Sequence, residues 1–374
     1  MSEYWNSRVC SITPYIPGEQ PRDKTLIKLN TNENPYPPSP AVFEALQKID
    51  INRLRLYPDP ECTDLRNAIA SIYGVRREEV FAGNGSDEIL AFAFGAFFET
   101  PPCFQSGSVK GAENNKTAHT VMFPDITYSF YPVYAALWSL PYREIPLSAN
   151  WHIKKRDYFE PSGGVIIANP NAPTGIAMQP EDILEIAAAQ KHHNAVVIVD
   201  EAYSAFADAS IVPFLSGGGH NNILSVHTFS KSYSLAGLRA GYAIGSANLI
   251  AALERIRDSF NSYTVDMLAQ TAARAAVLDR DYFSMTCEKV IATRERISSR
   301  LNILGFEVLR SSANFIFIKH PLLSGADFFM RLRENGVLTR RFNKPRIQDF
   351  LRVTIGTDND MDIFLELCSR SLNK

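Results

Sequence analysis

The stretch Ala195-Val196-Val197-Ile198-Val199-Asp200-Glu201-Ala202-Tyr203 joins an apolar run to an acid and a phenol. A short run rich in valine and isoleucine is typical of a strand buried on both faces, as in parallel sheets covered by helices. In such sheets, ligands bind beyond the carboxyl ends of the strands. We therefore expect Asp200 and Tyr203 to lie at a binding site.

Similar apolar runs recur through the first two thirds of the chain and alternate with helical patterns. One helix is expected to start at Pro180, because proline suits a first turn and two acids follow near the positive end. This alternation predicts an α/β fold with a mostly parallel central sheet flanked by helices. The expected strands are 80–82, 120–123, 165–168, 196–199, 223–226 and 240–244. Gly85, Tyr128, Asn171, Asp200 and Lys231 follow such strands.

The chain from about residue 261 has a different pattern. A long helical stretch is expected to continue to Leu301, and short strands are expected at 306–309, 314–318 and 351–355, with a helix between the last two. This α+β pattern predicts a second, smaller domain. The expected division is a large ligand-binding domain over 35–260 and a small domain formed by 1–34, including an N-terminal arm, together with 261–374. The polar segment from Gln105 to Thr120 is expected to be an exposed loop insertion.

Composition and charge narrow the class of protein. The 374 residues are 45% hydrophobic, which is enough for one large domain and one smaller domain. The formal net charge of −2 provides no basic surface for nucleic acid or for a membrane. No apolar run approaches the roughly 20 residues that span a bilayer, and no secretion signal is apparent. The five cysteines are dispersed and the histidines show no ligand spacing, so we expect reduced thiols, no metal site and a cytoplasmic location.

A lysine between hydroxyl residues follows one of the predicted strands, in the run Thr228-Phe229-Ser230-Lys231-Ser232, and Arg239 comes soon after it. Together with Asp200, these residue types suit pyridoxal 5'-phosphate. The Lys231 amine would bond to the aldehyde of the cofactor, and Asp200 would pair with its protonated ring nitrogen. Lys231 must lose a proton to act as nucleophile and base, which requires cationic neighbours and partial desolvation. The residues expected to hold the phosphate here are Thr228, Ser230 and Arg239.

A glycine-containing turn, Gly83-Asn84-Gly85-Ser86-Asp87-Glu88, lies between a predicted strand and an apolar helix. Its glycines let the backbone approach an anion, and the free amides of the first helical turn point toward it. An ordinary helix cap is the alternative explanation. In combination with Lys231 and Arg239, the turn predicts a phosphate cradle that includes Gly85, Ser86 and Asp87.

Three residues are candidates for contact with the cofactor ring. Tyr128 could stack on the face of the ring, although core packing also explains an aromatic residue there. Asn171 could donate to the phenolic oxygen of the ring, with a plain Pro/Gly turn as the alternative. Tyr203 could serve the same oxygen and stabilise its deprotonated form. Lys231, Asp200 and Tyr203 are therefore the predicted catalytic residues.

Runs distributed over nearly the whole chain carry a family resemblance. They are Thr13-Pro14-Tyr15-Ile16-Pro17-Gly18, Leu29-Asn30-Thr31-Asn32-Glu33-Asn34-Pro35, Tyr57-Pro58-Asp59, Gly83 to Glu88, Asp200-Glu201-Ala202-Tyr203, Ser230-Lys231, Leu235-Ala236-Gly237-Leu238-Arg239-Ala240-Gly241 and Leu351-Arg352-Val353-Thr354-Ile355-Gly356-Thr357. With them the chain resembles class II pyridoxal-phosphate aminotransferases of the aspartate aminotransferase fold type I. Within that group it resembles the histidinol-phosphate aminotransferases of histidine biosynthesis, which interconvert L-histidinol phosphate plus 2-oxoglutarate and imidazole acetol phosphate plus L-glutamate.

The resemblance implies roles for further residues. It implies a homodimer in which Tyr57 reaches the cofactor phosphate of the neighbouring subunit. Arg352 would bind the substrate α-carboxylate through a two-pronged fork that lysine cannot mimic. Arg340 would meet the substrate phosphate, and its neighbour Arg341 leaves open which of the two faces inward; a surface charge is the alternative for Arg340. The remaining substrate contacts implied are Tyr15 and Asn34.

One departure from the family pattern bears on the cofactor contacts. The family usually has asparagine before Pro-Thr-Gly, where this chain has Ala172, so Asn171 and Tyr203 are the two candidates for the missing contact. Two other enzymes stay open. An aromatic or broad-specificity aminotransferase would share every cofactor residue, and a threonine-phosphate decarboxylase uses the same scaffold and also needs phosphate-binding arginines. A pyridoxal-phosphate sensor joined to a DNA-binding module is disfavoured by the near-zero net charge.

Overall fold

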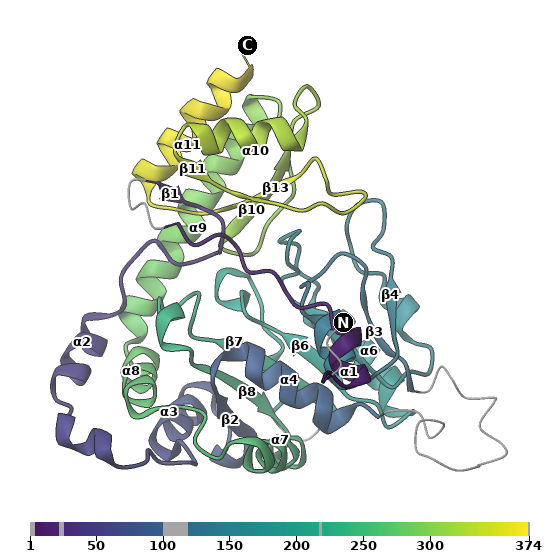
Figure 1. Cartoon of the computed structure of the whole chain (residues 1–374), viewed down its shortest axis with the longest axis vertical. Helices are drawn as coiled ribbons and strands as arrows, with labels where there is room; N and C mark the ends of the chain where they lie inside the picture. Colours follow the sequence, from purple (N-terminus) through teal and green to yellow (C-terminus); the bar gives the residue numbers. More distant parts are fainter. Residues whose placement is uncertain (1–3, 22–25, 100–118, 217–218, 373–374) are drawn as a thin grey trace.

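The computed structural model describes residues 4–21, 26–99, 119–216 and 219–372. The loop expected at 105–120 lies outside these residues except for its last two positions. A seven-stranded sheet occupies the centre of the larger part of the molecule, in the order β2-β8-β7-β6-β5-β3-β4 (Figure 1). Its strands are β2 (Val80–Gly83), β3 (Val121–Pro124), β4 (Tyr142–Ile145), β5 (Gly164–Ala168), β6 (Val197–Asp200), β7 (Ile223–Thr228) and β8 (Gly241–Gly245).

The sheet is mostly parallel, as predicted. Strands β4, β3, β5, β6 and β7 run in the same direction, and only β8 is antiparallel to both of its neighbours. Gly241, the first residue of β8, pairs with Thr228 at the end of β7 and with Gly83 at the end of β2. The ends of β2, β5, β6 and β7 and the start of β8 therefore meet at one edge. This edge collects the segments that carry the predicted site.

Helices cover both faces of the central sheet. Helices α4 (Gly85–Phe97), α5 (Tyr131–Leu137) and α7 (Ala247–Phe260) pack on one face, where Phe81, Ile166 and Ile198 are fully buried. Helices α3 (Thr63–Tyr73) and α8 (Met267–Leu278) cover part of the other face, and α6 (Pro180–Lys191) covers the rest. Each large apolar side chain buried in this way contributes about 1.5–3 kcal/mol. Helix α6 begins at Pro180, as predicted.

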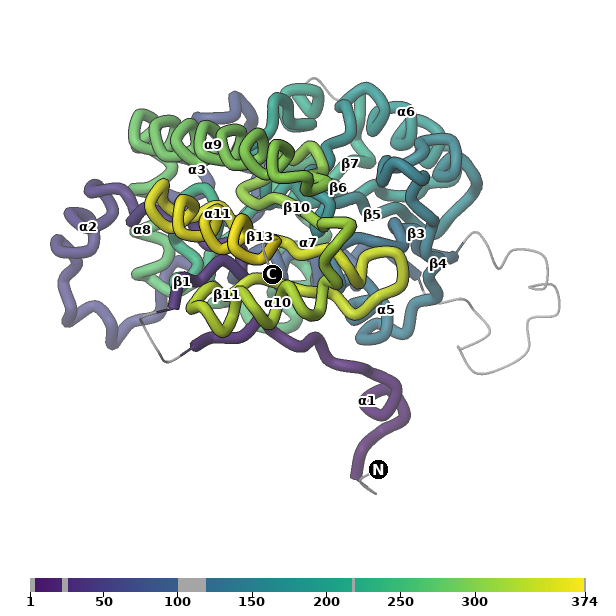
Figure 2. Tube along the Cα trace, turned by 90° about the horizontal axis from the view of Figure 1, so that it is seen from above, coloured from purple at the N-terminus to yellow at the C-terminus, as the bar shows by residue number. Residues whose placement is uncertain are grey.

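A second, smaller group of elements packs beside the large sheet (Figures 1 and 2). Its four-stranded antiparallel sheet has the order β12-β13-β10-β9, which confirms the α+β pattern. In addition, the N-terminal β1 (Ile27–Lys28) pairs with β11 (Val337–Leu338). The other members are β9 (Glu307–Val308), β10 (Phe315–Lys319), β12 (Arg340–Arg341), β13 (Leu351–Thr354), α9 (Arg280–Ile303), α10 (Gly325–Glu334) and α11 (Asp358–Leu372). The division at residues 34/35 and 260/261 stays a prediction.

The long helical stretch expected to run to Leu301 is two helices rather than one. Helix α8 ends at Leu278, and α9 begins at Arg280. The side chain of Asp279 between them accepts a hydrogen bond from the Tyr282 amide, which caps α9. An aspartate in this role favours the start of a new helix over continuation of the old one.

The remaining elements are short. They are α1 (Ser7–Ser11), α2 (Pro40–Gln47) and the 3-10 helices Ile51–Arg55, Arg77–Glu79, Lys155–Tyr158, Ser204–Phe206, Val212–Phe214 and Ala236–Leu238.

Within the described ranges, no helix is long and apolar enough to cross a membrane.

Candidate active site

A cavity of about 550 Å³ lies where the strand ends meet. Ala168, Asp200 and Thr228, the last residues of β5, β6 and β7, all line it. A larger depression of about 840 Å³ beside His320 contains none of the predicted site residues. The predicted residues that line the 550 Å³ cavity are Tyr15, Ser86, Asp87, Tyr128, Asp200, Tyr203, Thr228, Ser230, Lys231, Arg239, Arg340 and Arg352.

The loop after β7 carries Lys231 into the cavity. Its amine donates a hydrogen bond to the main-chain oxygen of Thr31 at 2.9 Å. Burial, together with the positive charge of Arg352, lowers the pKa of Lys231 to about 8. A large fraction of this amine is therefore neutral near pH 8, which is the form that attacks a carbonyl.

Asp200 lies at the end of β6 and is almost fully buried. Its Oδ2 atom accepts a hydrogen bond from the Tyr131 hydroxyl at 2.9 Å, and its Oδ1 atom accepts one from the Ala202 amide at 3.2 Å. Burial raises the pKa of Asp200 to about 6, and the hydrogen bond from Tyr131 opposes that rise. The carboxyl group is therefore mostly ionised at neutral pH and can pair with a cation.

The predicted phosphate residues come together at one corner of the cavity. The Arg239 Nη2 atom lies 3.2 Å from Asp87 Oδ2, and its Nη1 atom donates to Ser230 Oγ at 3.4 Å. Thr228 donates to the same Ser230 oxygen at 3.0 Å. Gly85 has φ +79°, and a Cβ atom there would lie 2.8 Å from Arg239 Nη2. The positive φ favours glycine at this position, and the missing Cβ atom lets the guanidinium lie against the α4 turn.

Aromatic rings form one wall of the cavity. Tyr15 from the N-terminal arm stacks on Phe130, with ring centroids 4.4 Å apart. The Tyr128 hydroxyl donates to Asp87 Oδ1 at 2.8 Å, so its ring is held in a fixed orientation. The Tyr203 hydroxyl accepts a hydrogen bond from Asn32 Nδ2 at 2.8 Å.

Two arginines of the small sheet bring positive charge to the cavity. Arg352 donates to the Asn30 main-chain oxygen at 2.9 Å. Its buried Nε atom has no hydrogen-bond partner among the residues that the structure describes. Arg340 lines the cavity. Arg341 does not line it, and its side chain donates to the Gln348 main-chain oxygen at 3.1 Å. Of the adjacent pair, Arg340 is therefore the one that faces the site.

Two predicted site residues, Asn171 and Asn34, do not line the cavity in this structure. The Asn171 amide donates to the Ile126 oxygen at 2.9 Å and to Thr174 Oγ1 at 3.1 Å, and its oxygen accepts from Thr127. These contacts within the protein use the side chain, and Ala172 rather than Asn171 lines the cavity. Tyr203 is thus the remaining candidate for the phenolic oxygen.

Asn34, expected to contact the substrate, is also outside the cavity lining. Its amide donates to the main-chain oxygens of Lys231 at 3.1 Å and Ser232 at 3.3 Å. It therefore fixes the backbone of the lysine loop, and its contact with the substrate stays a prediction. Tyr57 is 81% exposed and stacks on Tyr263 at 4.6 Å, away from the cavity of its own chain.

The sequence does not single out several residues that line the cavity. The pattern around Phe130 favours core packing, and Thr31, Asn32 and Glu33 stand out only as part of a family run. The asparagines that recur at positions 30, 32 and 34 are an available signal, although the segment is not an extended strand, since Asn32 has φ +56°. Asn30 and Asn32 are indeed buried, and Asn32 holds Tyr203.

Comparisons with known proteins show the family to which the chain belongs. The family model described as "Aminotransferase class I and II" matches residues 24–367. Histidinol-phosphate aminotransferases from Clostridium acetobutylicum and Chromohalobacter salexigens are 49% and 47% identical, each match covering 98% of both chains.

A solved structure is similar as well. The histidinol-phosphate aminotransferase from Sinorhizobium meliloti in complex with pyridoxal-5'-phosphate has a TM-score of 0.84 and 23% identity, and the match covers 100% of this chain and 99% of that one. At that identity the likeness supports the fold, while the curated relatives support the family. The chain belongs to the class I and II aminotransferases and, within them, to the histidinol-phosphate aminotransferase family.

Proposed function

We propose that this aminotransferase transfers an amino group from L-glutamate to imidazole acetol phosphate, giving 2-oxoglutarate and L-histidinol phosphate, and catalyses the reverse reaction, with pyridoxal 5'-phosphate as cofactor. The observation that carries the proposal is one cavity that combines a lysine, a buried carboxylate and three arginines. The bound cofactor would supply an aldehyde that takes up the amino group and a ring that stabilises negative charge on the substrate carbon.

The side chains fit that cofactor. Gly85, whose positive φ favours glycine, lets the α4 turn approach Arg239, and together they suit a phosphate. Asp87 forms an ion pair with Arg239 across that corner. We expect a phosphate to compete with Asp87 for the guanidinium. Ser86, Thr228 and Ser230 add hydroxyl groups on the cavity wall.

Three residues would carry out the proton chemistry. Lys231, whose pKa is lowered to about 8, can form the covalent bond and can then move a proton as a general base. Asp200 would hold a positive charge on the ring nitrogen. Tyr203 would donate to the phenolic oxygen, and Asn32 keeps its hydroxyl in place.

The substrates carry two kinds of anionic group. We assign the α-carboxylate of glutamate to Arg352. Its buried Nε atom has no hydrogen-bond partner among the described residues, so this donor is available to the carboxylate. We assign the phosphate of the second substrate to Arg340, which lines the same cavity. Tyr15, stacked on Phe130, would lie against the substrate side chain.

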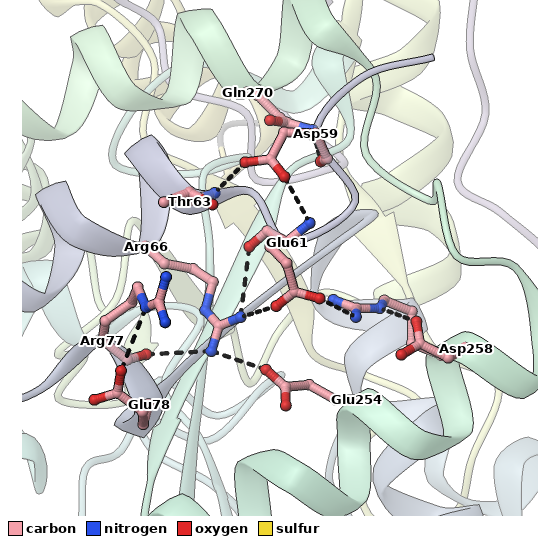
Figure 3. Close-up of polar contacts among 10 residues, drawn as sticks. Asp59, Glu61, Thr63, Arg66, Arg77, Glu78, Glu254, Asp258 and Gln270 are labelled. Atoms are coloured by element: carbon pink, nitrogen blue, oxygen red, sulfur yellow. Dashed lines mark hydrogen bonds and ion pairs between the residues drawn. The ribbon is translucent and has the colours of Figure 1, made fainter.

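A homodimer is part of the proposal, with Tyr57 reaching the cavity of the partner subunit. Glu61 lies four residues after Tyr57. It forms an ion pair with the buried Arg66 at 3.0 Å (Figure 3). It forms a second ion pair with Arg257 at 3.2 Å. These pairs tie Glu61 to α3 and α7, and the exposed ring of Tyr57 stacks on Tyr263. Apolar side chains exposed nearby, which a second copy would cover, are Ile51, Leu54, Leu56, Tyr57, Phe260 and Tyr263.

We also assign the reaction to the cytoplasm. The dispersed cysteines support this, since the described ones, Cys10, Cys62, Cys287 and Cys368, are free thiols.

The test is a panel of amino acceptors supplied with glutamate and purified holoenzyme. Imidazole acetol phosphate is expected to be the preferred acceptor by kcat/KM over aromatic keto acids. A preference for aromatic keto acids would indicate an aromatic or broad-specificity aminotransferase. Release of carbon dioxide from threonine phosphate would indicate a decarboxylase instead.

A further inference from the structure

Tyr131 is the first residue of α5, and both its ring and its hydroxyl are completely buried. The hydroxyl donates to Asp200 Oδ2 at 2.9 Å. The ring is fixed by edge-to-face contacts with Phe123 at 5.8 Å and with Tyr128 at 5.6 Å. A packed ring cannot swing its hydroxyl away, so the donor stays directed at the carboxylate.

A second observation concerns the two oxygens of Asp200. Oδ1 accepts from the Ala202 amide at 3.2 Å, and Oδ2 accepts from Tyr131. The two donors approach different oxygens, and each carboxylate oxygen still has a free lone pair. The rotation of the carboxylate is thereby restricted while it can accept one more donor from the cavity.

We propose that Tyr131 is a positioning residue, which holds Asp200 ionised and oriented toward a cationic ring nitrogen in the cavity. This inference rests on the proposed function, because it assigns a ligand to Asp200. A phenol whose own pKa is raised well above its ordinary value by burial and by the charge of Asp200 stays a donor throughout the working range. Tyr131 therefore keeps its own proton, donates it in the hydrogen bond and stabilises the carboxylate form of Asp200.

The other titratable groups around Asp200 do not replace this donor. Asp87 raises the pKa of Asp200, so it opposes ionisation. Tyr128 donates to Asp87 instead, and Tyr203 accepts from Asn32. The remaining titratable neighbours are Tyr134, whose hydroxyl contacts Asp87, and Glu201, whose carboxylate accepts from Ser210 and Ser225. Tyr131 is thus the side chain that hydrogen-bonds to Asp200 in the described structure.

The experiment compares apoenzymes in their binding of pyridoxal 5'-phosphate across pH, followed by absorbance. Tyr131→Phe keeps the ring and removes the hydroxyl. We expect its affinity near neutral pH to fall about ten-fold or more, the loss expected for a hydrogen bond to a charged group. The loss should shrink at higher pH, where Asp200 ionises without help, so the affinity profile shifts to higher pH.

The chain offers a matched control. Tyr158 is also fully buried, but its hydroxyl has no hydrogen-bond partner among the described residues. Tyr158→Phe therefore removes the same atom without touching Asp200, and its binding profile should match that of the unchanged protein. Thermal unfolding of each apoenzyme verifies that the variants fold.

A double-variant cycle separates action through Asp200 from a packing effect. If Tyr131 acts through the carboxylate, Tyr131→Phe should have little further effect on cofactor affinity in an Asp200→Asn background. Infrared titration of the apoenzymes gives an independent measurement, since the protonated Asp200 carboxyl should persist to higher pH in Tyr131→Phe.

The outcomes are distinct. A Tyr131→Phe apoenzyme with the affinity and pH profile of the unchanged protein overturns the positioning role. An equal loss of affinity from Tyr131→Phe in the unchanged protein and in the Asp200→Asn variant also overturns it. If the unchanged protein itself fails to bind the cofactor, the proposed function is wrong, and that result is visible before any variant is made.

Discussion

The Lys231 amine donates to the main-chain oxygen of Thr31, although the two residues are 200 positions apart in the chain. The segment after β1 thus crosses the cavity and meets the lysine directly. Asn34, from the same segment, holds the main-chain oxygen of Lys231. The N-terminal segment therefore sets the position of the amine before any cofactor binds.

The first prediction concerns the protonation of Lys231. Because only the neutral amine attacks an aldehyde, covalent capture of pyridoxal 5'-phosphate by apoenzyme should accelerate with pH, with a midpoint near 8. Arg352→Leu should move the midpoint upward, since the charge of Arg352 lowers the pKa of Lys231. Stopped-flow absorbance measures both rates. A rate that does not change through this range would argue against the lowered pKa.

Arg352 should be sensitive even to a conservative change. Arg352→Lys keeps the charge but loses the planar fork, so the KM for glutamate and for 2-oxoglutarate should rise by roughly 30-fold or more. Arg341→Lys, at an arginine outside the cavity lining, is the matched control and should behave normally. Steady-state kinetics decide the matter, and an unchanged KM in Arg352→Lys would remove Arg352 from the carboxylate site.

Arg340 should discriminate between the two substrates. Arg340→Ala is expected to raise the KM for the phosphorylated substrate by about ten-fold or more and to leave the half-reaction with glutamate nearly unchanged. Arg341→Ala should leave both half-reactions unchanged, because its guanidinium contacts Gln348 outside the cavity. Single-turnover absorbance resolves each half-reaction. An equal loss of rate in both half-reactions would mean that Arg340 does not bind the substrate phosphate specifically.

The stability of the apoenzyme should depend on Glu201, a buried carboxyl behind the site. Burial raises the pKa of Glu201 to about 7, above its ordinary value of 4.5. The stability that this group contributes is fully present below about pH 4 and is lost as pH rises through 7. His227, 3.5 Å away, does not compensate, since burial lowers its pKa to about 3 and leaves it neutral.

The measurement is the difference in unfolding temperature between the unchanged apoenzyme and Glu201→Gln, taken from about pH 4 to about pH 8. The unchanged protein should lose stability relative to the variant as the carboxyl ionises. A difference that stays constant with pH would show that Glu201 does not titrate in this range.

The sheet and the edge where its ligands gather could be predicted from the sequence, because buried parallel strands leave continuous apolar runs with polar residues after them. Lys231, Asp200 and Arg239 are found in this way, and the structure brings all three to one cavity. Their proximity follows from strand order, in which β6, β7 and β8 are neighbours.

The direction of side chains in the loops could not be predicted from the sequence. Asn171 and Ala172 are adjacent, and pattern alone does not tell which one faces the cavity. The outcome depends on backbone groups, since the Ile126 oxygen takes the Asn171 amide. Tyr131 is a second example. In the sequence it looks like an ordinary aromatic core residue, and only the structure shows that its hydroxyl donates to Asp200.

The covalent link to Lys231 is tested most directly by borohydride reduction of holoenzyme, followed by peptide mass spectrometry. The account predicts a phosphopyridoxyl group on the peptide containing Lys231, and none on that peptide in a Lys231→Ala variant, which should also lose turnover. A label on a different lysine, or normal turnover in Lys231→Ala, would contradict it.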